Sequence, residues 1–91
     1  MAKKIDIEYC GGWGWGGTAT RLKKALQQAF AGVDIDCHSA NGWTGKVVVS
    51  WVDGGQKKVV WEGGRDATDG GHAAIANALK GSQWLRIKKR I

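Results

Sequence analysis

The sequence predicts an α+β fold with one four-stranded mixed sheet, in the element order β-α-β-β-β-α, and two helices on one face of that sheet. Two observations predict it. The hydrophobic pattern changes from a two-residue period to a helical period and back again within residues 4–37. An Asp-Gly-Gly triplet at residues 53–55 then separates two apolar runs. The first pattern indicates a strand, a helix and a strand, and the second indicates a hairpin.

The first three elements are expected to form a βαβ unit. Residues 4–9 (KIDIEY) alternate apolar and polar side chains, as in a strand with one wet face. From Thr18 onward apolar residues recur three and four positions apart, which predicts a helix that Gly32 ends. Residues 33–37 (VDIDC) alternate again and place Cys37 on the core side. Two parallel strands joined by a right-handed crossover follow from this order.

The next two strands, residues 45–52 and 56–62, are expected to form a tight antiparallel hairpin, because glycine supplies the positive φ of the turn. Both faces of this hairpin are apolar. One face is expected to carry Val47, Val49, Trp51 and Val60, and the other Val48, Val52, Val59 and Trp61. The second face is either a partner site, which includes self-association, or is covered by a tryptophan or the C-terminal tail.

A second helix is expected over residues 72–81, capped by Thr68 or Asp69 and closed near Gly81. Residues 82–91 carry four cations within five positions and either extend this helix or form a basic tail. We therefore expect a domain over residues 1–81 and a basic C-terminal extension over residues 82–91.

Length and composition exclude several classes of protein. The chain has 91 residues, enough for one domain with a thin core. No apolar stretch approaches the roughly 20 residues that span a bilayer, and the first nine residues lack the apolar centre of a signal peptide. A cytoplasmic protein without membrane contact is therefore expected. Its two cysteines are too few for a secreted disulfide scaffold and are candidates for chemistry.

Four segments resemble selenoprotein W and its relatives, selenoproteins T and H. They are YCGGWG at 9–14, RLKKALQQAF at 21–30, Cys37 in the second strand, and WTGKVVV at 43–49. The resemblance covers about residues 4–80. It implies a thioredoxin-like fold, a thiol-redox role with Cys10 as nucleophile, and a motif loop that includes Gly11, Gly12 and Gly14. Lys46 and the valines after it depart from the Phe-Glu-Val of that family.

Trp13 departs from the family pattern more than Lys46 and the valines do. The family pattern is Cys-x-x-selenocysteine or Cys-x-x-Cys, and Trp13 occupies the second redox position. An indole forms no disulfide, so the two-thiol mechanism is absent as written. Selenocysteine is specified by UGA, and the tryptophan codon lies one base away, so Trp13 is either native or stands for selenocysteine or cysteine. The amino-acid sequence leaves these alternatives open.

Cys10 is expected to react alone, exposed by the glycines around it. A free thiol has a pKa of about 8.5, and a helix N-terminus or nearby cations shift the equilibrium toward the thiolate. The following helix offers both, with Arg21, Lys23 and Lys24 as the cations. Such a thiol forms mixed disulfides with glutathione, as a co-substrate, or with client protein thiols. No other cofactor is expected.

Cys37 is a candidate second thiol. Both cysteines lie near the carboxyl ends of adjacent strands, but alternation places Cys10 with Glu8 on the opposite face from Cys37 unless the chain twists as it leaves the strand. A buried, unreactive Cys37 is the preferred interpretation.

Three other classes of function fit the sequence less well. Metal binding is not expected, because Cys10, Cys37, His38 and His72 have no zinc-ligand spacing. The net charge of +6 and six tryptophans suggest nucleic acid, but Asp6, Glu8, Asp34 and Asp36 make the open sheet face acidic, which argues against it. The alternative to a redox protein is a redox-inactive interaction module that uses Trp13, Trp15 and the hairpin face.

Overall fold

The computed structural model describes residues 3–12 and 14–90, with side chains described for residues 4–12 and 14–81. Its centre is a four-stranded sheet in the order β2-β1-β3-β4. The strands are β1 (Lys3–Tyr9), β2 (Asp34–Ser39), β3 (Val47–Asp53) and β4 (Gln56–Gly63). β1 pairs parallel with β2 and antiparallel with β3, and β3 pairs antiparallel with β4. The mixed sheet, the βαβ unit and the hairpin are therefore confirmed.

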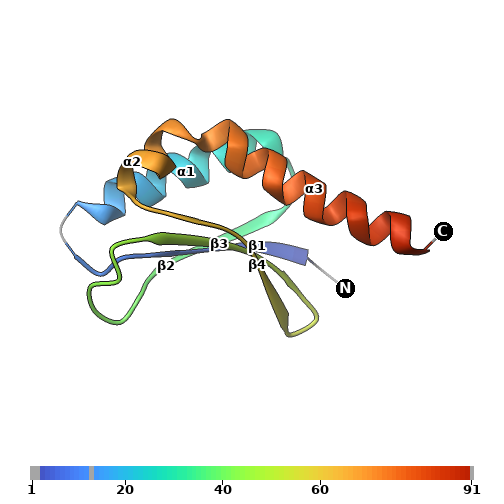
Figure 1. Ribbon diagram of the computed structural model, residues 1–91, viewed down its shortest axis with the longest axis horizontal. Helices are drawn as coiled ribbons and strands as arrows, with labels where there is room; N and C mark the ends of the chain where they lie inside the picture. Colours follow the sequence, from blue (N-terminus) through green and yellow to red (C-terminus); the bar gives the residue numbers. More distant parts are fainter. Residues whose placement is uncertain (1–2, 13, 91) are drawn as a thin grey trace.

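Helices cover one face of the sheet, and the other face is left without a helix (Figure 1). The described chain forms α1 (Trp15–Ala29), α2 (Arg65–Gly70) and α3 (His72–Arg90). The prediction of two helices was incomplete, because residues 65–70 form a short helix of their own. Thr68 lies inside α2 and does not cap α3: its hydroxyl donates to the Gly64 carbonyl oxygen at 2.7 Å.

α3 also differs from the prediction at its other end. The helix does not close near Gly81 but runs to Arg90, so residues 82–90 extend it. In Figure 1 this end of α3 projects past the sheet. A glycine inside a helix costs about 1 kcal/mol relative to alanine, which lets a helix continue when its neighbours favour it.

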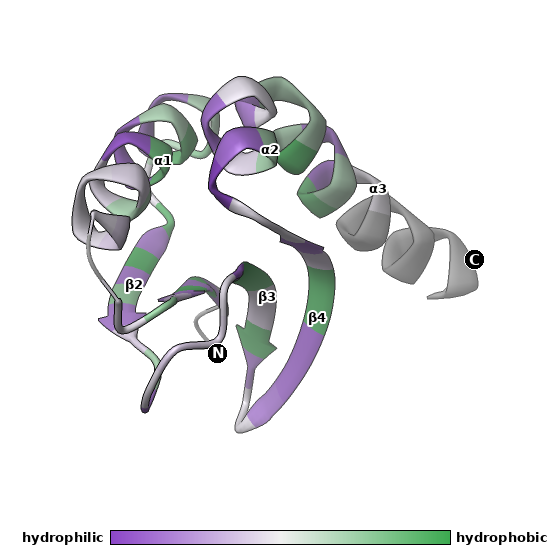
Figure 2. Ribbon diagram, turned by 60° about the vertical axis from the view of Figure 1, so that its left-hand side comes forward, coloured by the Kyte–Doolittle hydropathy of each residue, from purple (hydrophilic) through white to green (hydrophobic). Residues whose placement is uncertain are grey.

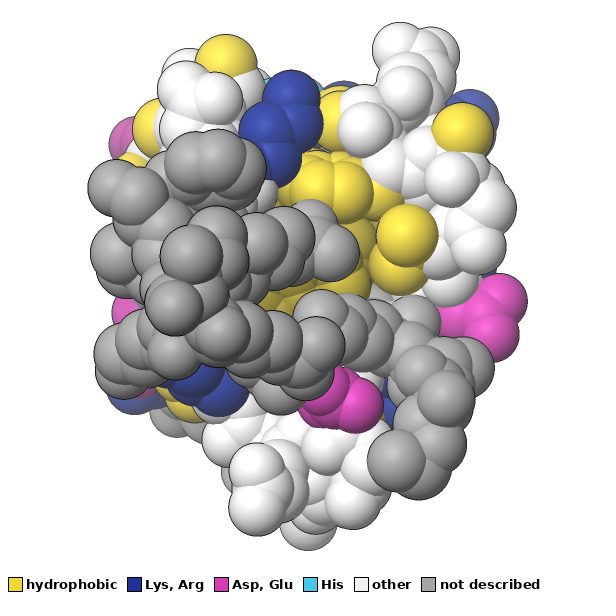
Figure 3. Space-filling model, turned by 90° about the vertical axis from the view of Figure 1, so that its right-hand side faces the viewer, with side chains coloured by type: hydrophobic (Ala, Val, Ile, Leu, Met, Phe, Trp, Pro, Cys, Tyr) yellow, Lys and Arg dark blue, Asp and Glu magenta, His cyan; other side chains and the backbone are white. Residues whose placement is uncertain are grey.

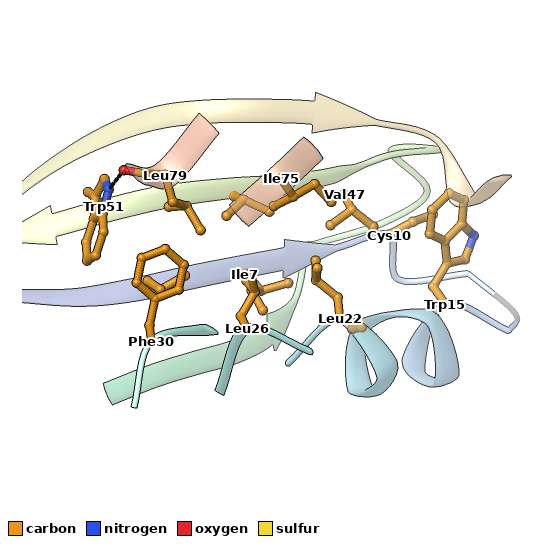
Figure 4. Close-up of a cluster of buried hydrophobic side chains, with 13 residues drawn as sticks. Ile7, Cys10, Trp15, Leu22, Leu26, Phe30, Val47, Trp51, Ile75 and Leu79 are labelled. Carbon is orange, nitrogen blue, oxygen red and sulfur yellow. Dashed lines mark hydrogen bonds between the residues drawn. The ribbon is translucent and has the colours of Figure 1, made fainter. Parts of the chain in front are cut away.

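The core lies between the sheet and the helices. Its fully buried aliphatic side chains come from β1, β3, α1 and α3: Ile5, Ile7, Leu22, Leu26, Val47, Val49, Ile75 and Leu79. At one end the rings of Trp51 and Phe30 pack edge-on, with their centres 5.8 Å apart. The Trp51 indole N–H donates to the Leu79 carbonyl oxygen at 2.9 Å (Figure 4). Hydrophobic side chains gather on that end of the surface (Figure 3). Cys10 and Trp15 lie at the other end of the core.

One hairpin assignment was wrong. The register shifts between Val49 and Ser50, so that Val49 pairs with Trp61 and Ser50 pairs with Val59. Val60 is the extra residue of a β-bulge, and a bulge changes which face the following side chains meet. Trp61 therefore lies on the core side, packed against the buried cluster. Val59 lies on the helix-free face as predicted and is 48% exposed. Along β4 the ribbon is hydrophilic at its start, hydrophobic in its middle and hydrophilic again near its end (Figure 2).

Candidate functional site

Cys10 directly follows β1, where the chain turns toward α1. Its side chain is only 1% exposed and belongs to the buried core cluster. The expectation that the glycines expose Cys10 was wrong. The strand ends at Tyr9, so the alternation that placed Cys10 on the face of Glu8 no longer applies to it. The chain twists as it leaves the strand, and the thiol turns under the helices.

Backbone groups surround the Cys10 sulfur. The Gly12 N–H donates to Cys10 Sγ at 3.4 Å. Burial by itself raises the pKa of the thiol, but hydrogen bonds from the backbone of Gly45, Gly12 and Thr44, and from the Thr44 side chain, outweigh it and lower the pKa below the ordinary value. Donors to sulfur favour the thiolate because they stabilise its charge. The sequence predicted a donor from the motif loop, and the Gly12 N–H is that donor. The contributions of Thr44 and Gly45 were not predicted.

The cations predicted to act on Cys10 lie elsewhere. A guanidinium N–H group of Arg21 (Nη2) donates to both carboxylate oxygens of Asp69, at 3.0 and 3.1 Å. This ion pair links α1 to α2. Lys23 lowers the pKa of Cys37. The pKa of Cys10 is lowered by hydrogen-bond donors instead.

The motif loop leaves little room for side chains. A Cβ on Gly11 would lie 2.9 Å from the carbonyl oxygens of Ala40 and Gly42. Gly14, the N-cap of α1, has φ +79°, and a Cβ there would lie 2.9 Å from the Arg65 guanidinium. The loop therefore needs glycine at both positions, for close backbone approach and for left-handed φ.

Two aromatic side chains flank the motif loop differently. Trp15 is buried in the core, and the Arg65 guanidinium lies 5.0 Å from the centre of its ring. Trp15 therefore presents little surface to a partner, contrary to the interaction-module alternative. Trp43 is 76% exposed, and a Cβ on Gly12 would lie 2.7–3.0 Å from three of its ring atoms. The indole thus rests on the loop beside Cys10, a placement that sequence reasoning missed.

Cys37 is half-buried on β2 and packs against the core, as predicted. Its neighbour across the sheet is Ile7, three residues before Cys10 along β1. Burial and the carboxylates of Asp36 and Asp6 raise the pKa of Cys37 despite Lys23. Both cysteines are free thiols.

The other residues singled out have these positions. Trp13 lies outside the described residues. His38 on β2 faces the Asp6 carboxylate at 3.0 Å, and His72 begins α3 with its Nε2 buried and unpartnered within the described chain. Within residues 4–12 and 14–81, no cluster of His, Cys, Asp or Glu could hold a metal ion. None of the described helices is both long and apolar enough to cross a membrane.

Fold and site together define a class of protein, the thioredoxin-like α+β proteins with a cysteine between the first strand and the first helix. The chain belongs to the Rdx family, whose model matches residues 4–76. This is the family of the selenoprotein W, T and H relatives, so the resemblance is confirmed at family level. Membership indicates a thiol-redox role of the thioredoxin-like type. Searches of curated proteins and of solved structures each found no match.

Proposed function

We propose that this protein is a single-thiol redox protein in which Cys10 exchanges disulfides with glutathione or with client protein thiols. The observation that supports it most is the Gly12 N–H, which donates to Cys10 Sγ at 3.4 Å and, together with the backbone of Thr44 and Gly45, lowers the pKa of the thiol. A thiolate is the nucleophile in disulfide exchange. Cys37, with a raised pKa, has no comparable support.

The reaction needs no cofactor besides the disulfide substrate. The Cys10 thiolate attacks one sulfur of oxidised glutathione, a new S–S bond forms, and the old S–S bond breaks. The second glutathione leaves as a thiolate with the electron pair, so Cys10 is oxidised as that glutathione is reduced. A further thiol then attacks the mixed disulfide and returns Cys10 to the thiol. Trp13 takes no part in this chemistry if it is native. If position 13 carries selenocysteine, its selenolate takes the place of the external thiol: it attacks the Cys10 sulfur of the mixed disulfide, a Se–S bond to Cys10 forms, and the glutathione leaves as a thiolate.

The test is incubation with oxidised glutathione followed by mass spectrometry of tryptic peptides. Cys10 and Cys37 fall in different peptides, because cleavage at Arg21, Lys24 and Lys46 separates them. We expect one glutathionyl group, on the Cys10 peptide. Cys10→Ser should abolish the adduct, and the matched variant Cys37→Ser should keep it. An adduct on Cys37 alone, or none on either cysteine, would contradict the proposal.

An interaction module without redox activity is the second candidate. The observation that favours it is the 76% exposed indole of Trp43. Binding of a client protein that survives both Cys10→Ser and reductant, with no glutathione adduct on the wild type, would favour this candidate over the redox protein.

A further inference from the structure

The burial of Cys10 conflicts with the access that its reaction requires. Disulfide exchange depends on access, because the attacking sulfur must reach a sulfur of the substrate. With 1% of its surface exposed, Cys10 cannot do so in the observed conformation. Part of the structure around the thiol must therefore open before it reacts.

Residues 42–45, which we call the lid, are the covering segment best able to move. They lie in the connection between β2 and β3, and all four are exposed. Glycines stand at both ends, Gly42 with φ +87° and Gly45 with φ +70°. Other neighbours of Cys10 in the buried cluster, such as Leu22 and Val47, belong to a helix and a strand in the core. Mobile loops with small hinge residues are the usual gates of reactive sites.

A backbone hydrogen bond and the Trp43 ring hold the lid against the motif loop. The Gly11 N–H donates to the Gly42 carbonyl oxygen at 3.0 Å. Thr44 and Gly45, on the same segment, lower the pKa of Cys10. The Trp43 ring rests on Gly12, so closely that a Cβ there would lie 2.7 Å from it. The indole is otherwise largely exposed, so its described packing is on the motif loop.

We propose that the lid gates Cys10, and that Trp43 is the positioning residue that keeps it closed by packing on Gly12. This inference rests on the proposed redox function and adds a conformational step before it. The closed lid stabilises the thiolate and hides it, whereas the open lid exposes the sulfur and withdraws the donors of Thr44 and Gly45. Opening therefore raises the pKa of Cys10 while it increases access.

The test is the rate of iodoacetamide labelling of Cys10 against pH, followed on its tryptic peptide by mass spectrometry. Wild-type Cys10 should label more slowly than in the urea-unfolded chain at a pH where both are thiolate. Trp43→Ala should label several-fold faster at high pH and show a higher apparent pKa. A general loss of packing would speed labelling of the Cys37 peptide as well, so that peptide is the internal reference.

Gly12→Ala tests the same contact from the other side. Its new Cβ would push the indole away, so this variant should also label faster with a higher apparent pKa. In the Trp43→Ala background, Gly12→Ala should add little, because the ring it displaces is gone. Gly16→Ala is the matched control, since a Cβ there meets nothing within 4 Å, and its Cys10 labelling rate and apparent pKa should match those of wild type.

Several results would contradict the proposal that the lid gates Cys10. One is wild-type labelling as fast as in the unfolded chain once the thiolate fractions are matched. Another is Trp43→Ala with unchanged rate and pKa and wild-type circular dichroism. If Trp43→Ala does not fold, Trp43→Phe decides: a smaller ring on Gly12 should give a smaller change of the same sign, and no change contradicts the lid. If the labelling rates and apparent pKa values change as expected but no variant forms a glutathione adduct, the lid is supported and the proposed redox function is contradicted.

Discussion

At the scale of single residues, Asp6 shows how the helix-free face tolerates a buried carboxylate. Asp6 is 6% exposed, although the opposite face carries the helices. His38 Nε2 from β2 lies 3.0 Å from one carboxylate oxygen, and Lys57 Nζ from β4 lies 3.0 Å from the other. Ser50, opposite Asp6 on β3, is buried without a hydrogen-bond partner in the described chain. Burial raises the pKa of Asp6, but its contacts with Lys57 and His38 lower it overall.

These contacts predict a pH dependence of stability. The folded pKa of Asp6 lies below its ordinary value of 3.8, so its ionised form stabilises the fold above that value. This contribution is lost as the pH falls from about 3.8 through the folded pKa. We expect Asp6→Asn to be less stable than wild type at pH 7, with the difference shrinking between about pH 5 and pH 2. Urea midpoints measured across this range check it.

Lysine variants separate this effect from general acid denaturation. Lys57→Gln removes a cation that lowers the pKa of Asp6 and should weaken the same pH dependence. Lys58 pairs with Trp51 and lies on the other face, so Lys58→Gln is the matched control. Equal pH profiles for the two lysine variants would contradict the role given to Lys57.

At the scale of elements, the start of α1 combines glycines with different requirements. Gly14 has a left-handed φ and the Arg65 guanidinium close by, whereas Gly16 has neither constraint, and a Cβ added there would meet nothing within 4 Å. A glycine inside a helix costs about 0.5–1 kcal/mol relative to alanine, because its unfolded state is freer. Alanine would fit at position 16, so glycine there makes the beginning of α1 less stable than it could be.

Two alanine substitutions test this contrast. Gly16→Ala should raise the free energy of unfolding by about 0.5–1 kcal/mol. Gly14→Ala should lower it by about 1 kcal/mol or more, because alanine resists the left-handed conformation. Thermal and urea unfolding followed by circular dichroism measure both. Changes of the same sign in the two variants would contradict this account of the α1 start.

At the scale of the whole molecule, Trp51 ties α3 to the sheet. Its indole N–H donates to the Leu79 carbonyl oxygen, and its ring packs edge-on against Phe30 of the α1 C-terminus. One side chain thus joins β3, α1 and α3 at the end of the core opposite Cys10 (Figure 4).

Trp51→Phe should lower the free energy of unfolding by about 1–3 kcal/mol, because it removes the buried hydrogen bond and leaves space behind. Chemical denaturation measures this loss. The Cys10 labelling rate in native buffer should stay close to wild type, since the two sites lie at opposite ends of the core. A large rise in Cys10 labelling would show that the two ends open together, contrary to a local lid.

Much of the fold could be predicted because its signals are local. The alternation in residues 4–9 and 33–37, the helical spacing after Thr18 and the Gly54-Gly55 turn each depend on neighbours in the chain. The place of Cys10 between the first strand and the first helix, and the family itself, followed from the same segments. The place of Cys37 on the core side of β2 also followed from alternation alone.

Contacts between distant segments decided the rest. The bulge at Val60 turned Trp61 to the core side, and a register shift depends on the pairing of two strands. Cys10 is buried, with donors from Thr44 and Gly45, because the β2–β3 connection folds back over the motif loop. The sequence by itself thus determined the family and singled out Cys10 as the candidate nucleophile, whereas the tertiary structure decided the access and acidity of Cys10, since both depend on groups far away in the chain.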